Sequence, residues 1–527
     1  MSIVSTIRSR ERFVPFSIIA LGYTISYGLS LLNSGVYWDD WILVDQRAPV
    51  ILDMFKDASG AAGYITGPLH ILMLALPHSV FIYRFFTFLL FLLSGYCLYL
   101  ILEQVPEIEY RDRFMLVLFF VLLPLNAARI SLITFHYTLR YFMFFVAFLL
   151  YVKYHRNLCA RTISLILFFL SFFTNSIVLF YVVFLLFMFY YERDDLTGAR
   201  LIGKIVLSSL DYILLPLVFV FVKYTYFIPS GAYTIYNKIQ PATIEGVLGK
   251  FLFVFKTSFQ GLLAVHGSLL SVFAVLIMAC WIIYVLRVSR ETLKNDKYDF
   301  IFLGIGGIAY ITATVPYLLV GAQPSYDDWQ SRHQLLMPLG TSFILYYGSK
   351  ISLSRLNISR SALYVVVAFL ALTFIMTNFL QQVEYTKDWF KQISLMGNLE
   401  SSKVIQDHTT FFFDDNIPQY NANGRTYRFY EYAGFMKKVF HDETRFGISR
   451  QEFRNFGSMD ALTPYFNAQY NLKDYKAATV DYTVSINPGP RTLTWNEYLR
   501  LSYYSLFQIG KFQGYAKALT NLALSKN

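Results

Sequence analysis

Two pairs of adjacent aspartates, each set among aromatic residues, are the part of this sequence best suited to chemistry. Asp39 and Asp40 stand in the string Tyr-Trp-Asp-Asp-Trp, and Asp327 and Asp328 stand in Tyr-Asp-Asp-Trp. A carboxylate at a bilayer surface can act as a general base, because partial burial raises its pKa and a nearby cation or metal lowers it again. The alternative for the first pair is a solvated helix end beside interfacial aromatic residues.

Basic residues accompany these carboxylates. Arg332 and His333 follow the second aspartate pair, and the planar fork of arginine suits a phosphate group. In the alternative interpretation they simply pair with Asp327 and Asp328 within one loop. Further basic residues are predicted on the same face, where they suit either a phosphate-containing substrate or phospholipid headgroups: His70, Arg84, Arg129, His136 and Arg140.

The composition places these residues in an integral membrane protein. Of 527 residues, 56% are hydrophobic and 15% are charged, whereas about 25% of the residues of a soluble protein are charged. Charge is concentrated at the end of the chain, since residues 384–527 hold 31 of the 79 charged side chains. The net charge of +11 comes largely from basic loops that set topology, so it does not indicate nucleic-acid binding.

Apolar stretches near the length of about 20 residues needed to cross a bilayer predict about 11 transmembrane helices. The stretch 162–191 is too long for one span, and Thr174-Asn175-Ser176 at its middle predicts a turn. Predicted inner segments hold 18 Lys and Arg against at most ten outside, which favours a cytoplasmic N-terminus. The stretches are 13–32, 85–102, 114–128, 141–152, 162–191, 205–222, 257–286, 300–319, 335–348 and 361–383.

The chain therefore divides into a transmembrane module, 1–383, and a soluble outer domain, 384–527. The domain is predicted to be small and α+β, with helices at 427–441 and 495–522 and strands at 408–413 and 477–486. It contains no cysteine, which is typical of an exported bacterial domain. The outer loops of the module are predicted at 35–80, 127–140, 228–256 and 321–333.

The arrangement of these motifs resembles the GT-C superfamily of integral-membrane glycosyltransferases, which use polyprenyl-phosphate sugars. The resemblance covers about residues 1–380. Two strings differ from the usual pattern, because tyrosine often stands at the place of His333 and the common order near His70 is His-Pro-Pro. The resemblance is carried by an acidic pair after an uncleaved first helix, an amphipathic stretch at 51–62, Gly67-Pro68-Leu69-His70, Arg84-Phe85-Phe86 and Arg332-His333-Gln334-Leu335-Leu336-Met337-Pro338.

The resemblance implies an inverting glycosyltransferase. Asp39 or Asp40 would take the proton from an acceptor hydroxyl, while Arg332, His333 and further basic residues such as Arg84 and His70 would stabilise the departing polyprenyl phosphate. A divalent cation, Mg or Mn, held by aspartates is an open possibility. The implied partners are a polyprenyl-phosphate-linked sugar, a glycan or lipid acceptor such as O-antigen, and membrane phospholipid, at the periplasmic face of a bacterial inner membrane.

Three alternatives stay open from the residues. A lipid or glycan flippase would carry polar sites near the bilayer midplane and matched interrupted helices in two halves. An O-antigen polymerase or ligase would depend on arginine and histidine in large outer loops. A non-catalytic scaffold would use the outer domain to bind a partner. The acidic pair directly after the first helix favours the glycosyltransferase.

Overall fold

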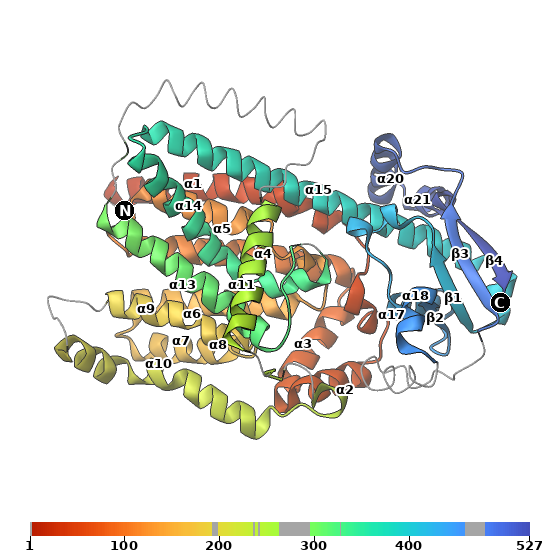
Figure 1. The fold of residues 1–527 in the computed structure, drawn as a ribbon, viewed down its shortest axis with the longest axis horizontal. Coiled ribbons are helices and arrows are strands. Elements are labelled where there is room, and N and C mark those ends of the chain that lie inside the picture. The colour runs from red at the N-terminus through yellow and green to blue at the C-terminus, as the bar shows by residue number, and fades with distance from the viewer. Residues whose placement is uncertain are drawn as a thin grey trace.

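Long apolar helices make up most of the chain, and a small sheet lies at one end of them (Figure 1). The computed structural model describes residues 3–191, 199–234, 238–240, 243–262, 293, 296–326, 328–458 and 480–527. Aromatic residues dominate the helical core, with rings such as Phe120, Tyr141, Phe144 and Phe180 packed in tilted pairs.

Six of the described helices are long and apolar enough to cross a membrane: Pro15–Leu32, Ser79–Leu102, Phe135–Tyr154, Ser208–Tyr226, Lys297–Leu319 and Arg360–Glu400. Shorter apolar helices, Leu158–Ser171 and Ser176–Tyr191, accompany them. The predicted multi-pass architecture is thus supported. The count of about 11 spans and the cytoplasmic N-terminus stay predictions, and most of the stretch 257–286 lies outside the described residues.

The elements of the membrane part follow one another without strands in the ranges described. They are α1 (Ile3–Tyr27), η1 (Gly28–Leu32), η2 (Trp38–Ile42), α2 (Ala48–Ser59), η3 (Gly60–Ala62), α3 (Gly63–Ala75), α4 (Ser79–Leu102), α5 (Tyr110–Leu122), η4 (Ala127–Ile130), α6 (Phe135–Tyr154), α7 (Leu158–Ser171), α8 (Ser176–Phe180), α9 (Val182–Tyr191), α10 (Ala199–Tyr226), η5 (Gly231–Thr234), α11 (Ile244–Leu262), α13 (Lys297–Leu319), η6 (Trp329–Gln334) and α14 (Met337–Arg355).

The turn predicted inside the apolar stretch 162–191 is confirmed. Helix α7 ends at Ser171 and α8 begins at Ser176, with the amide of Ile177 bonded to the carbonyl of Thr174. Asparagine and serine favour such a break because their side chains and small size tolerate turn geometry. The chain therefore reverses where a single helix would have been too long for the bilayer.

Helices α13 and α14 approach each other closely at two glycines. A Cβ atom on Gly340 would lie 2.4 Å from the backbone nitrogen of Tyr310 and 2.8 Å from the carbonyl oxygen of Gly306. Only a residue without a side chain fits such a distance between helix backbones. This crossing matters for the candidate site, because η6 connects α13 to α14.

The same helices share a buried ion cluster. The Lys350 ammonium lies 2.9 Å from a carboxylate oxygen of Asp112 and 2.8 Å from one of Asp299, and the Tyr346 hydroxyl donates to Asp112. All three charged residues are less than 10% exposed. One cation thus joins α5, α13 and α14, in the manner expected of charges that are buried only when paired.

The long helix α15 (Arg360–Glu400) leads from the bundle to the C-terminal elements (Figure 1). It passes without interruption through the boundary predicted at 383/384. Beyond that point its apolar side chains Phe390, Leu395 and Leu399 are fully buried in the core of the C-terminal part. The proposed division into two domains is therefore made within a helix and not at a flexible linker.

The predicted α+β character of the C-terminal part is supported. A four-stranded sheet has the order β2-β1-β3-β4, with β1 parallel to β2 and β3, and β4 antiparallel to β3. The described elements are α16 (Lys403–Asp407), β1 (Thr410–Asp415), η7 (Pro418–Tyr420), η8 (Ala422–Gly424), α17 (Phe429–Phe440), β2 (Phe446–Ser449), α18 (Arg450–Phe456), β3 (Tyr482–Pro488), α20 (Trp495–Phe507), α21 (Ile509–Ala516), η10 (Lys517–Leu519) and β4 (Thr520–Lys526).

The helix predicted at 495–522 is wrong at its C-terminal end. It is broken into α20 and α21, and the residues from Thr520 onward form β4 instead. The Asn398 side chain on α15 donates to the carbonyl of Thr520, and β4 pairs with β3 along its length. These tertiary contacts override the helical preference of the local sequence, as is common for strands.

The glycine crossing gives a stability prediction. Gly340→Ala should lower the free energy of unfolding by about 1–3 kcal/mol, because the new methyl group overpacks the contact with Tyr310. Gly348→Ala on the same helix is the matched control, since a Cβ there meets nothing within 4 Å. It should be neutral or stabilising by up to about 1 kcal/mol. Thermal unfolding of both variants in detergent measures this, and equal midpoints would contradict the close crossing.

Candidate active site at the outer end of the bundle

Asp40 is a buried carboxylate that holds a neighbouring loop. In η2 it is fully buried, and its oxygens accept hydrogen bonds from the Ser131 hydroxyl at 2.5 Å and from the amides of Leu132 and Ile133 at 2.8 and 2.9 Å. Burial raises the pKa of Asp40 to about 6, while these three bonds and the charge of Arg84 act in the opposite direction. Its contacts indicate a structural role.

Asp39, the preceding residue, has different neighbours. It is partly exposed, and it lies near the guanidinium groups of Arg332 and Arg428 and accepts a hydrogen bond from the Tyr430 hydroxyl. Burial raises the pKa of the Asp39 carboxyl, and these three groups moderate the rise. Of the two predicted catalytic aspartates, Asp39 is therefore the one with the surroundings of a reactive group.

The two acidic strings are in direct contact. The indole nitrogen of Trp38 donates to a carboxylate oxygen of Asp328 at 3.2 Å, and the Trp38 and Trp329 rings are stacked with centroids 5.2 Å apart. The Arg332 guanidinium lies 4.2 Å from the centroid of Trp329 on η6. Asp327, predicted as an acidic partner, lies outside the described residues.

A cavity of about 830 Å³ lies beside Arg332. Its walls combine the cations Arg332 and Lys238 with His333 and with apolar residues such as Phe253 and Val320. Burial and the charge of Arg332 lower the pKa of His333 to about 3, so this imidazole is neutral at pH 7. A cavity with cationic and apolar walls suits an amphiphilic phosphate compound.

Arg84 forms hydrogen bonds to backbone carbonyl groups of the protein. Its guanidinium donates to the carbonyls of Asn33, Gly35 and Ile130, and it lies over the Tyr37 ring at 5.6 Å. These bonds join α4 to the start of the first outer loop and to η4. Arg84 therefore stabilises the loop that carries Asp39.

The buried rings of His70 and His136 and the half-buried Arg140 form a separate cluster. The His70 ring bonds to the Tyr83 hydroxyl at 2.8 Å and to the His136 ring at 3.1 Å, and Arg140 donates to the Thr66 hydroxyl at 2.6 Å. Burial, followed by the charge of Arg140, lowers the pKa of His70 to about 3. These three predicted phosphate-binding residues hold α3, α4 and α6 together.

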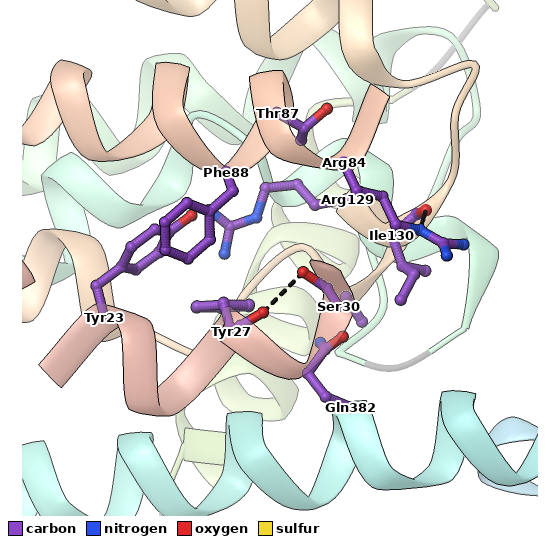
Figure 2. A pocket seen from close by; sticks show the side chains of 10 residues that line it. Tyr23, Tyr27, Ser30, Arg84, Thr87, Phe88, Arg129, Ile130 and Gln382 are labelled. Carbon is purple, nitrogen blue, oxygen red and sulfur yellow. Dashed lines mark hydrogen bonds between the residues drawn. The ribbon is translucent and has the colours of Figure 1, made fainter. Parts of the chain in front are cut away.

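Arg129 lies in yet another place. Its guanidinium is between the rings of Tyr27 and Phe91, at 4.2 and 3.9 Å from their centroids. It lines a narrow cleft between α1 and α4 (Figure 2). Of the seven basic residues predicted to bind phosphate, only Arg332 and His333 stand beside the large cavity.

A buried ion network from the C-terminal part supports Asp39. Arg425 donates to Asp388 on α15 at 2.9 Å and to both oxygens of Glu431 on α17 at 2.8 and 2.7 Å. Glu431 in turn accepts from the backbone amide of Trp38 at 3.2 Å. Burial raises the pKa of Glu431 to about 7 against the effect of Arg425. The network sets the position of the residue next to Asp39.

The sequence analysis missed the residues that the C-terminal part brings to the site, namely Arg425, Arg428, Tyr430 and Glu431. Nothing in the local sequence marked them, because they lie in an ordinary amphipathic helix and the loop before it. Lys238 was also missed as an individual residue, although it falls within a predicted outer loop.

The described carboxylates do not fit a bound Mg or Mn ion. Asp40 turns its oxygens toward hydrogen-bond donors, and Asp39 has two arginines near it. Among the described residues no three His, Cys, Asp or Glu side chains gather as a ligand set. A hard divalent cation needs several oxygen ligands together, without competing cations.

The different roles of Asp39 and Asp40 can be tested by measuring how much each substitution changes the stability of the folded protein. Asp40→Asn should destabilise the protein by about 1–3 kcal/mol, because its amide group would meet donors where the carboxylate accepts. Asp39→Asn should change stability by less than about 1 kcal/mol, since Asp39 is partly exposed. Thermal unfolding distinguishes them, and an Asp39 variant less stable than the Asp40 variant would reverse the assignment.

The raised pKa of Asp40 also predicts a pH dependence. Its folded-state pKa of about 6 lies above the ordinary aspartate value of 3.8, so the folded protein binds a proton more tightly than the unfolded chain. This contribution to stability is present below about pH 4 and is lost as the pH rises to 6. The difference in unfolding midpoint between the native protein and Asp40→Asn should therefore narrow from pH 4 to 6 and stay constant above 7. If the difference in unfolding midpoint widened between pH 4 and 6, the raised pKa of Asp40 would be contradicted.

No family model and no curated protein matches this chain. Two solved structures from Archaeoglobus fulgidus align with 97% of it and with 74% of their own chains. One is the archaeal oligosaccharyltransferase AglB in complex with an inhibitory peptide and a dolichol-phosphate, at 12% identity and a TM-score of 0.41. The other is an oligosaccharyltransferase tethered to an acceptor peptide, at 13% identity and a TM-score of 0.37. Similarity at this level leaves the function to be argued from the site.

Proposed function

We propose that this protein is an inverting glycosyltransferase of GT-C type. It would move a sugar from a polyprenyl-phosphate donor to a cell-envelope glycan or lipid acceptor, such as O-antigen, at the periplasmic face of a bacterial inner membrane. The observation that carries the proposal is the position of Arg332, which borders the 830 Å³ cavity on one side and interacts with Asp39 on the other.

The cavity supports a lipid-phosphate donor. Arg332 and Lys238 would bind the phosphate, and neutral His333 can donate one hydrogen bond to it. Helix α11 forms an apolar wall, and its side chains Leu248, Leu252 and Phe253 are each more than half exposed. A polyprenyl chain would lie along this helix, within the hydrocarbon of the membrane.

Asp39 is suited to be the base. An acceptor hydroxyl placed between Asp39 and the cavity would lose its proton to this carboxylate as its oxygen attacks the anomeric carbon. The bond from that carbon to the phosphate oxygen breaks, and the phosphate leaves with an additional negative charge. Arg332 would stabilise that charge, and one such donor contributes roughly 3 kcal/mol to lowering a barrier. A single displacement inverts the configuration.

The acceptor would enter from the side of the C-terminal part. Arg428 is exposed there, and Tyr430 bonds to Asp39, so both would be in reach of the acceptor. The outer domain thus takes part in the proposed site through these residues.

The proposal is tested with purified protein, a panel of labelled polyprenyl-phosphate sugars and an envelope glycan fraction. Asp39→Asn should lower the transfer rate by at least about 100-fold, the scale of general-base catalysis. Asp45→Asn is the matched control, because it removes an exposed charge from the same loop and should retain full activity. If Asp39→Asn folds and transfers sugar at the native rate, Asp39 is not the base.

A further inference from the structure

The cleft between α1 and α4 contains the buried cation Arg129. Arg129 is 6% exposed, and neither terminal nitrogen of its guanidinium has a partner in the described structure. Tyr27 and Phe91 cover the two faces of the group. Ring faces attract a cation, but they leave the in-plane N–H groups unsatisfied. The edge of the guanidinium is therefore available to an acceptor.

The charge around this cleft is not balanced by its walls. Arg84 also lines it, and its described hydrogen bonds go to neutral carbonyls. The described lining residues are Tyr23, Tyr27, Ser30, Arg84, Thr87, Phe88, Ala127, Arg129, Ile130 and Gln382, none of which is acidic. The carboxylate that acts on Arg84 is Asp40, which the loop after η4 already binds. Asp40 thus acts on Arg84, and no described lining residue offers a carboxylate to Arg129, so an anion in the cleft would complete the pairing.

The mouth of the cleft lies between two helices that are candidate membrane spans. Ser30 and Phe88 are half-buried there, and Gln382 of α15 forms part of the wall (Figure 2). The same two helices also carry exposed apolar side chains, among them Leu21, Ile25 and Phe85. Such a surface is covered by lipid in a membrane, so the molecules that reach this mouth are lipids.

From these observations we propose that the cleft binds the phosphate of an anionic membrane lipid, with its acyl chains against α1 and α4. The site is distinct from the donor cavity. Arg129 of η4 serves the cleft and Arg332 of η6 serves the cavity, and the two segments are joined by a hydrogen bond from the Ala128 amide to the Ser331 hydroxyl at 2.9 Å. A lipid bound at Arg129 would thereby act, through this hydrogen bond, on η6, the segment that carries Arg332.

The cleft must open slightly to admit the phosphate. The space now open inside it is about 20 Å³. That space suits about one water molecule. The half-buried ring of Phe88 at the mouth is the side chain that would turn outward, as rotamer changes on binding are common.

The test is native mass spectrometry of the delipidated full-length protein with phosphatidylglycerol, with phosphatidylcholine of the same acyl chains, and with inorganic phosphate. Native protein should bind phosphatidylglycerol at one site about tenfold more tightly than Arg129→Gln does, the effect of one charge-assisted bond. Arg129→Lys should bind with intermediate affinity. Thr87→Phe, which fills the cleft while keeping both arginines, should also lose the lipid, and it decides the matter if Arg129→Gln does not fold.

Three outcomes would overturn the proposal. Equal binding of phosphatidylglycerol by native protein, Arg129→Gln and Thr87→Phe would show that the lipid lies elsewhere. Equal binding of phosphatidylcholine would show that anionic charge is not recognised. Displacement of the lipid by millimolar inorganic phosphate, with phosphate bound in its place, would identify a site for a free anion. None of these outcomes depends on sugar transfer, so the proposed function stands or fails separately.

Discussion

The candidate site depends on the ion pairs made by the buried guanidinium of Arg425. It is paired with Asp388 on α15 and with Glu431 on α17, and Glu431 holds the amide of Trp38. Burying such charges costs several kcal/mol for each ion unless their partners stay in place. The network therefore permits one arrangement of the outer part against the first outer loop. Asp39 receives its position from this arrangement.

The backbone of the site is held in conformations that it would not adopt alone. Trp38 has a φ of 48°, Asn126 a φ of 61° and Asp328 a φ of 76°. Positive φ is uncommon for residues other than glycine, and for a bulky residue such as tryptophan it carries strain of about 1–3 kcal/mol. All three residues lie in or beside the segments η2, η4 and η6 that meet here. Strain gathered at one place is what a preorganised site requires, and the surrounding hydrogen bonds offset it.

Much of the architecture could be predicted from sequence, because apolar length and charge density report directly on the membrane and the outer part. The turn after Ser171 is of this kind. The roles of Asp39 and Asp40 could not be separated, since adjacent residues of one type differ only in the direction the backbone gives them. Arg84 and His70 were predicted near phosphate, yet their bonds to carbonyls and to Tyr83 arise from tertiary packing that local sequence does not reveal. Strand β4 was missed for the same reason.

The continuity of α15 has a mechanical consequence. Its 41 residues form a rod about 60 Å long, about twice the thickness of the hydrocarbon layer. Because the sheet and α17 pack on the far part of this rod, the C-terminal part keeps a constant distance from the helical bundle and cannot swing as a domain on a flexible linker would. In the proposed reaction, an acceptor would present its hydroxyl at that distance from the bundle. The depth of helix α15 in the bilayer would then determine which hydroxyl along a bulky acceptor can react.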